Sequence, residues 1–238
     1  MSSILNIETS TEVCSVNISI NGKLLSEKES LEGLNHSELL TVFIDELFRE
    51  NNLEMKAIDA VAVAKGPGSY TGLRIGVSVA KGLCYALDKP LIAISTIDAM
   101  GIFTSQNPEK FGLRTEEKKN LLFCPMIDAR RMEVYTALYN LKGEQLEPVS
   151  AKIIDENSFS ERLKKSKISF FGNGAAKCKE ALTHPNSLFS GPEKASARFM
   201  IKLAEEKYNN KEFENVAYFE PFYLKNFIAT VPKNKLKE

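Results

Sequence analysis

Apolar residues in the first hundred positions recur with periods that predict alternating strands and helices. Between positions 13 and 20 apolar and polar residues alternate, and this period of two is typical of a half-buried strand. Apolar residues at helical spacing over 37–49 predict a helix, and Ser37 is a favourable capping residue. The uninterrupted apolar run 60–64 indicates a strand buried on both faces. Further strands are expected at 4–10, 23–31 and 90–95, and further helices at 71–87 and from about residue 96 onward.

The second half of the chain repeats this order after the charged segment 107–120, which contains proline and glycine and is expected to be a linker. The pattern there predicts three strands, a helix, a strand and two helices, at 121–128, 132–140, 144–153, 158–166, 168–172, 174–183 and 195–209. We therefore expect an α/β protein of two similar domains, 1–106 and 107–238, each with a mixed sheet flanked by helices. The last residues, about 20 in number, are expected to form an extended tail.

Glycine-rich loops stand at corresponding places in the two halves. The segments KGPGSYTG (65–72) and FGNGAAK (171–177) both follow the fourth strand of a half and open a helix, which predicts a sharp turn. The first is not a Walker A loop, because Thr71 and Gly72 stand where that motif needs Gly-Lys, and Pro67 lacks an amide donor. The alternative is a weak nucleotide or anion contact. Its candidate residues are Thr9, Ser10, Gly68 and Ser69.

The helix expected at 71–87 is apolar over most of its circumference. Its polar residues form one stripe of Arg74, Ser78, Lys81 and Tyr85. A helix that covers one sheet face needs only one apolar arc, so this helix is expected to be covered on two sides. The helix 37–49 also has a wide apolar arc. Either the two helices pack against each other, or they form an exposed apolar patch that a partner covers.

Composition narrows the class of protein without defining it. The 238 residues include 31 Lys+Arg and 31 Asp+Glu, and this zero net charge gives no reason to expect autonomous nucleic-acid binding. The four cysteines are far apart and are expected to be buried, reduced thiols. The first ten residues lack the basic and apolar regions of a signal peptide, and no apolar run approaches the roughly 20 residues of a membrane span. We therefore expect a cytoplasmic protein.

One charged cluster, Asp128-Ala129-Arg130-Arg131, leaves two interpretations open. It could be an anion clamp, or a turn between two strands whose charges lie on the surface or at the domain interface.

Four segments together resemble one protein family. These are ILNIETST (4–11), GPGSYTGLRIG (66–76), IDARRMEVY (127–135) and PFYLKNF (221–227), and they are similar to the TsaB (YeaZ) family. The resemblance spans nearly the whole chain, and its one mild departure is Lys225 where the family usually has arginine. The resemblance implies two RNase H-like domains of the actin-like ATPase superfamily. It also implies a role in forming threonylcarbamoyladenosine (t6A) in tRNA, at the adenosine next to the anticodon.

The resemblance further implies an accessory subunit without catalytic or metal-binding residues of its own. The catalytic paralogue TsaD has an H-x-x-x-H metal motif, and its two histidine positions fall near Thr96 and Met100 here. Neither side chain can replace imidazole at a hard catalytic metal. The implied partners are TsaD, the ATPase TsaE and, through the complex, tRNA, with a homodimer when the chain is isolated. No tightly bound cofactor is implied, and ATP or ADP is expected only at the complex interface.

The same resemblance implies that the chain pairs with TsaD through its two N-terminal-domain helices. The expected interface residues are Leu39, Phe43, Leu47, Ile75, Val79 and Leu83. Two other hypotheses remain open. The chain could be an enzyme acting on its own, as an ATPase or a peptidase, or it could be a standalone RNA-binding protein.

Overall fold

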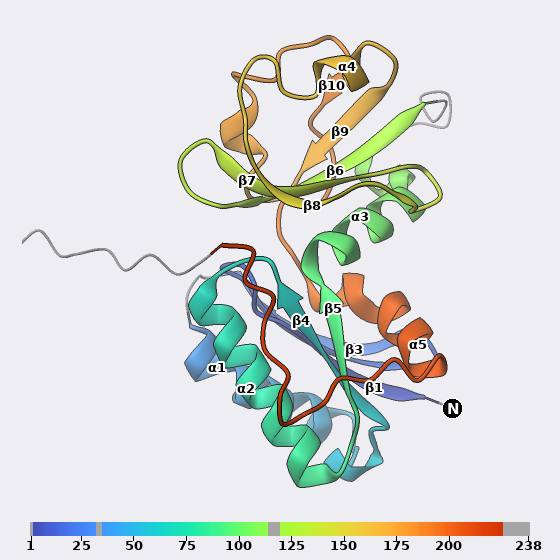
Figure 1. The fold of residues 1–238 in the computed structure, drawn as a ribbon. Helices are drawn as coiled ribbons and strands as arrows, with labels where there is room; N and C mark the ends of the chain where they lie inside the picture. The colour runs from blue at the N-terminus through green and yellow to red at the C-terminus, as the bar shows by residue number, and fades with distance from the viewer. Residues whose placement is uncertain (1, 32–34, 114–119, 226–238) are drawn as a thin grey trace, which may run out of the picture.

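The first domain is built on a five-stranded mixed sheet. In the computed structural model, which describes residues 2–31, 35–113 and 120–225, its strands run in the order β3-β2-β1-β4-β5 (Figure 1). Their bounds are β1 Ser3–Glu8, β2 Cys14–Ile20, β3 Lys23–Ser30, β4 Ala60–Gly66 and β5 Leu91–Ser95. The first three pair antiparallel, and β4 and β5 continue from β1 in parallel. The strands that the sequence predicted in this half are therefore confirmed.

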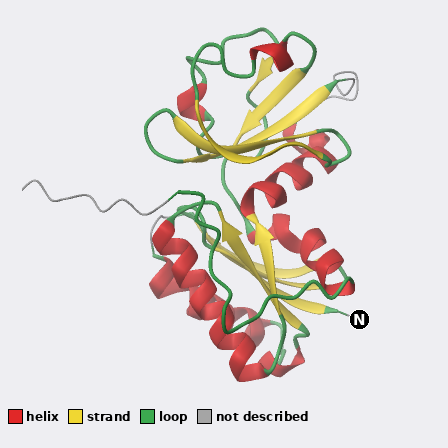
Figure 2. Ribbon diagram, in the orientation of Figure 1, coloured by secondary structure: helices red, strands yellow, loops and turns green. Residues whose placement is uncertain are grey.

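Helices cover both faces of this sheet (Figure 2). Two of them, α1 (His36–Glu50) and α2 (Tyr70–Leu87), lie on one face, and α5 (Ile201–Asn209) lies on the other. Short 3-10 helices, η1 (Met55–Ala57) and η5 (Ala197–Met200), complete the layers. None of the helices in the described ranges is both long and apolar enough to cross a membrane.

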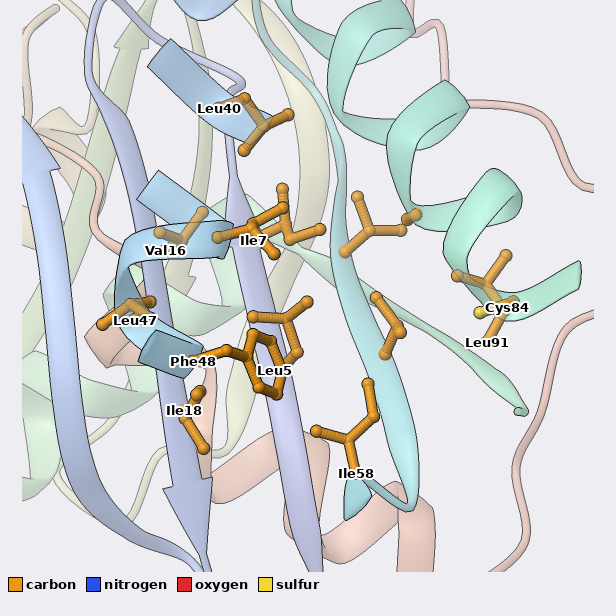
Figure 3. Packing of buried hydrophobic residues seen from close by; sticks show 14 of the residues in the cluster. Leu5, Ile7, Val16, Ile18, Leu40, Leu47, Phe48, Ile58, Cys84 and Leu91 are labelled. Atoms are coloured by element: carbon orange, nitrogen blue, oxygen red, sulfur yellow. The ribbon is translucent and has the colours of Figure 1, made fainter. Parts of the chain in front are cut away.

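The core between the sheet and the helix pair α1–α2 is made of branched and aromatic side chains (Figure 3). It includes Leu5, Ile7, Val16, Ile18, Leu40, Leu47 and Phe48, each no more than 3% exposed. Strand β4 alternates between the two faces: its valines join this core, and its alanines, Ala60, Ala62 and Ala64, join the cluster under α5. Each fully buried aliphatic side chain contributes about 1.5–3 kcal/mol of transfer free energy, so this core dominates the stability of the domain.

The second domain repeats the arrangement with the strand order β10-β9-β6-β7-β8. The bounds are β6 Leu121–Asp128, β7 Glu133–Tyr139, β8 Gln145–Ile153, β9 Lys167–Phe171 and β10 Ser187–Leu188. Strands β6, β7 and β8 pair antiparallel, and β9 pairs in parallel with both β6 and β10. The expected fold class, two α/β domains with mixed sheets flanked by helices, is confirmed.

Helix α3 (Thr96–Gln106) joins the two domains. It follows β5 directly, and the Ser95 hydroxyl caps it by accepting from the Asp98 amide at 3.2 Å. The helix packs on β6 and β7 of the second sheet. The tyrosine Tyr139 of β7 donates to Asp98 at 2.5 Å, and its ring lies where a Cβ at Gly101 would be. The 3-10 helix η2 (Pro108–Phe111) follows within the segment expected to be a linker.

Two helices predicted in the second domain are much shorter than expected. The helix expected at 158–166 is the four-residue α4 (Ser160–Leu163), because Phe159 before it is left-handed, with a φ of 61°. The helix expected at 174–183 contains only the 3-10 helix η4 (Ala176–Cys178) within a series of turns. Bonds of the i to i+3 type, such as Cys178 to Ala175, repeat along this segment and keep Cys178 and Leu182 in the core.

The chain returns to the first domain after β10. The helix expected at 195–209 is η5 followed by α5, and Ala197, Met200 and Ala204 pack against the alanine face of β4. We call residues 213–225 the C-terminal strap. It crosses β5, where the Glu214 amide donates to the Leu91 carbonyl. It then follows α2 toward the second domain (Figure 1). The expected second domain, 107–238, included these segments, whereas η5, α5 and the strap residues Val216 and Phe219 pack on the first one. Residues 226–238 of the expected tail lie outside the described residues.

Candidate functional site

The glycine loop, residues 66–69, lies directly against the N-terminal loop, residues 9–13. A Cβ atom at Gly68 would overlap the carbonyl oxygen of Ser10, and one at Gly72 would overlap that of Thr9. Both separations would fall below the 3.0 Å that Cβ atoms keep. These two glycines are therefore required by the close approach of two backbone segments.

The residues predicted to contact an anion are brought together here, and their polar groups bond to one another and to neighbouring residues of the fold. The Thr9 hydroxyl donates to the Gly72 carbonyl at 2.8 Å, and the Ser69 amide donates to the Ser10 carbonyl at 2.6 Å. The Ser69 side chain caps α2 by accepting from the Gly72 amide at 3.3 Å. Thr9 and Ser10 are fully buried, and Gly68 is half-buried. The geometry is that of a turn and a cap, and an anion contact by these residues stays a prediction.

Glu8, the last residue of β1, holds the N-terminal loop from inside the fold. Its carboxylate accepts from the Ser10 amide at 2.6 Å, and the side chain is 1% exposed. Burial raises the pKa of this carboxyl above its ordinary value, and hydrogen bonds to Ser10 and Thr96 act in the opposite direction. Thr96, the first residue of α3, also donates to the Ser10 hydroxyl at 3.0 Å. The start of α3, the glycine loop and the N-terminal loop are thus one bonded unit.

A cleft of about 950 Å³ opens between the domains on the side of the glycine loop. We call it the domain cleft. It is lined mainly by four segments, 10–12 and 67–71 of the first domain, 127–133 of the second, and 222–225 of the C-terminal strap. Its lining therefore comes from parts of the chain that are far apart in sequence.

Two side-chain links cross the domain cleft. The Asn173 amide nitrogen donates to the Glu12 carboxylate at 2.8 Å, which joins the turn after β9 to the N-terminal loop. Lys225 of the strap forms an ion pair with Glu133 of β7. These links connect the first domain and the strap to the second domain across the cleft.

The turn that joins β6 to β7 contains Arg130 and Arg131, both exposed and both lining the domain cleft. Their φ angles are 71° and 51°, so both residues are left-handed. Asp128 accepts from the Arg130 amide at 2.8 Å and pairs with Lys177. Within the described part of the chain, neither guanidinium has a hydrogen bond or ion pair. The interpretation of this cluster as a turn at the domain interface fits the geometry, and the anion clamp remains open.

The expected interface residues on α1 and α2 divide into two groups. Leu47 is fully buried in the core and offers a partner no surface, because α1 lies with this side on the sheet. The other five are half-buried and pack on the rim of that core: Leu39, Phe43, Ile75, Val79 and Leu83. The exposed large apolar or aromatic side chains of the same helices are Val42, at 47%, and Tyr85, at 87%. The helical pattern did not indicate Val42, because its position lies outside the apolar arc of 37–49.

The C-terminal strap bonds to two residues of the polar stripe of α2, Arg74 and Lys81. Lys81 donates to the carbonyls of Ala217 and Phe219 at 3.2 and 3.0 Å. Arg74 donates to the Tyr223 hydroxyl at 3.4 Å. Figure 1 shows the strap running along α2. The sequence predicted that α2 is covered on two sides. The C-terminal segment supplies part of the second cover, because Val216 and Phe219 pack against the core beside α2. The helical pattern alone could not indicate this.

The two positions that correspond to the paralogue's histidines lie in the interior. Thr96 is fully buried, and Met100 is 1% exposed among the side chains between α3 and the second sheet. Among the residues that the structure describes, no group of three or more His, Cys, Asp or Glu side chains could hold a metal ion. All four cysteines are buried and free, as predicted.

Known proteins share this architecture. The structure of YeaZ from Pseudomonas aeruginosa is similar to it with a TM-score of 0.76 and 26% sequence identity, over 94% of this chain and 100% of that chain. The family model described as TsaD, tRNA N6-adenosine threonylcarbamoyltransferase, matches residues 30–233. The class of protein is therefore that of the TsaD-related two-domain proteins.

Relatives in sequence narrow this class. The tRNA threonylcarbamoyladenosine biosynthesis protein TsaB of Haemophilus influenzae is 29% identical over 95% of this chain and 94% of its own length. The protein of the same name from Buchnera aphidicola is 31% identical over 68% of this chain and 71% of its own length. The chain belongs to the TsaB (YeaZ) family.

Proposed function

We propose that this chain is an accessory, non-catalytic subunit for the formation of t6A in tRNA. The observation that carries the proposal is similarity along almost the whole chain, both domains included, to relatives named as threonylcarbamoyladenosine biosynthesis proteins. The non-catalytic part is supported by the buried Thr96 and Met100, which stand where the paralogue's histidines would be. Threonine and methionine do not supply the ligands of a hard catalytic metal.

The proposed partners are the catalytic subunit TsaD and the ATPase TsaE, with tRNA reached through the complex. Helices α1 and α2 form the proposed surface for TsaD, because they carry five half-buried apolar side chains and the exposed Val42. The same surface would pair two copies of the isolated chain. ATP or ADP would bind only at the complex interface, and we expect the complex in the cytoplasm.

The test is a reconstitution of t6A formation. TsaD, TsaE, the threonylcarbamoyl-adenylate donor and unmodified tRNA are combined with and without this chain, and modified nucleoside is measured by mass spectrometry after digestion. We expect product only when the chain is present, and no product when the chain replaces TsaD.

Two outcomes would contradict the proposal. If product forms equally well without the chain, the accessory role is wrong. If the purified chain alone hydrolyses ATP or forms product, the hypothesis of an independent enzyme is correct instead. A variant of the proposed surface, described below, separates loss of the partner from loss of the fold.

A further inference from the structure

The turn between β6 and β7 keeps two arginines in an unfavourable backbone conformation. Arg130 and Arg131 have φ angles of 71° and 51°. Side chains clash with the backbone in this left-handed region, and two successive left-handed turn positions favour Asn and Gly. Residues held in such conformations cluster at functional sites. This conformation therefore indicates a functional role for the two arginines. Both of them line the domain cleft.

Within residues 2–31, 35–113 and 120–225, no carboxylate of the domain cleft pairs with Arg130 or Arg131. Three carboxylates line it, and each has a neighbour that donates to it: Lys177 to Asp128, Lys225 to Glu133, and Asn173 to Glu12. The guanidinium groups of Arg130 and Arg131 have no such neighbour among the described residues. Guanidinium groups bind phosphate oxygens through two parallel hydrogen bonds. The cleft thus presents two unused phosphate-binding groups in spite of the zero net charge of the chain.

The glycine loop and the N-terminal loop, which line the other side of the cleft, do not form a phosphate-binding loop for a nucleoside triphosphate. The Ser69 amide is bonded to the Ser10 carbonyl, the Ser69 side chain caps α2, and Pro67 has no amide hydrogen. The N-terminal loop is packed against Gly68, where a phosphate-binding loop needs open space. These observations favour a ligand whose phosphates meet the arginines at the exposed edge of the cleft.

An exposed aromatic ring lies on the first-domain side of the same cleft. Phe222 is 44% exposed, and its amide donates to the Lys65 carbonyl at 2.8 Å, which fixes its backbone. The next residue, Tyr223, packs its ring on Tyr70 with centroids 4.7 Å apart. Grooves that combine free cations with fixed aromatic rings are typical of sites for single-stranded nucleic acid, because bases stack on the rings while cations hold the backbone.

We propose that the domain cleft is a contact site for single-stranded RNA, in which Arg130 and Arg131 hold backbone phosphates and a base stacks on Phe222. The inference rests on the proposed function in one respect, the choice of RNA as the ligand. It adds a direct contact between this chain and the RNA, distinct from the surface of α1 and α2 that we assign to the protein partner.

The first experiment measures binding of a fluorescein-labelled single-stranded 12-nucleotide oligouridylate to the full chain, by fluorescence anisotropy at several salt concentrations. The variant R130N/R131G is expected to bind at least about tenfold more weakly, and to lower the slope of log affinity against log salt by about 1.4, or 0.7 for each lost phosphate contact. The variant F222A is expected to weaken binding about fivefold or more through lost stacking.

Two controls separate binding from folding and from total charge. The variant K164Q/K165Q removes the same two charges from exposed positions that do not line the cleft, and its affinity should change less than about twofold. The melting temperature of R130N/R131G should rise by a few degrees, about 2–4 °C for each kcal/mol of strain relieved, because Asn and Gly suit the left-handed turn. Weaker RNA binding by a more stable protein would support the proposal.

The proposal would be overturned by an absence of binding to the unaltered chain, by equal affinity in R130N/R131G, or by an equal loss of affinity in K164Q/K165Q. Displacement of the oligonucleotide by lower concentrations of Mg-ATP than of unlabelled RNA would also overturn it, since the ligand would then be a free nucleotide.

The t6A reconstitution distinguishes this proposal from the proposed function. With R130N/R131G in the complex, the KM for tRNA should rise while kcat at saturating tRNA is preserved. If the chain is required but this KM is unchanged, the RNA contact is wrong and the accessory role stands. If the chain is not required, the accessory role is wrong, and the oligonucleotide titration alone decides the RNA contact.

Discussion

Within α2, the effect of a glycine depends on what lies next to it. A Cβ at Gly76 would overlap the Thr9 side-chain oxygen, whereas nothing lies within 4 Å of one at Gly82. We expect Gly76→Ala to lower the free energy of unfolding by about 1–3 kcal/mol through overpacking. Gly82→Ala should raise it by up to about 1 kcal/mol, because alanine is the better helix former. Urea unfolding of both variants measures the contrast, and equal effects would contradict the contact between α2 and the N-terminal loop.

The buried Glu8 makes stability depend on pH. Because burial raises the pKa of Glu8 in the folded state above the unfolded value, which is near 4.5, the folded state binds more protons between the two values. Its contribution is therefore greatest below about pH 4.5 and is lost as the pH rises through the folded pKa. As the pH rises from about 4.5 through the folded pKa, the unfolding free energy of the wild type should fall relative to that of Glu8→Gln. A difference that stays constant from pH 4 to pH 8 would refute the effect of burial.

At the scale of elements, one lysine attaches the C-terminal strap to α2. Lys81→Gln removes a charged donor from the carbonyls of Ala217 and Phe219, and the strap should be weakened locally by about 1 kcal/mol or more. Hydrogen–deuterium exchange should rise in peptides covering 213–225 and stay unchanged in those from β1. Lys56→Gln is the control, since Lys56 is exposed on η1 and forms no hydrogen bond or ion pair with the described residues of the strap. Equal exchange in both variants would show that the strap is held by its apolar contacts instead.

The proposed partner surface is tested best at its exposed positions. Val42→Glu should weaken binding to TsaD at least about tenfold, because a carboxylate would be buried without a partner in the interface. Leu146→Glu, on the exposed strand β8, makes the same change at a similarly exposed residue of the other domain and should leave binding unchanged. Isothermal titration measures both, after circular dichroism has shown that the variants fold. Leu47→Glu should abolish folding, since Leu47 is core.

At the scale of the whole molecule, the first domain depends on segments that the sequence pattern placed in the second. A fragment of residues 1–106 would lack α5 and the strap, and it would expose the apolar face formed by Ile4, Ala62 and Ile92. We expect this fragment to aggregate or to lack a cooperative unfolding transition. Adding residues 196–225 through a flexible linker should restore a monomer with a cooperative transition, measured by size-exclusion chromatography and thermal circular dichroism. A stable fragment 1–106 would contradict the dependence.

Local periodicity was sufficient to predict most elements of the first domain. The alternation over 13–20 and the run 60–64 became β2 and β4, because a strand turns alternate side chains to opposite faces and a central strand is buried on both. The cap at Ser69 could likewise be predicted, since it depends on bonds over a few residues. The two short helices of the second domain were predicted too long because glycine, turn bonds and a left-handed Phe159 override a weak helical pattern.

The sequence by itself determined which residues need burial, where the strands and helices alternate, and that two similar α/β domains follow one another. Only the tertiary structure decided which surface covers each apolar face. It placed α5 on the alanine face of β4, the strap on the polar stripe of α2, Leu47 in the core, and Arg130 and Arg131 in a left-handed turn at the domain cleft. The physical reason is that hydrophobic periodicity records a need for burial and carries no information on the partner, which depends on contacts between residues far apart in the chain.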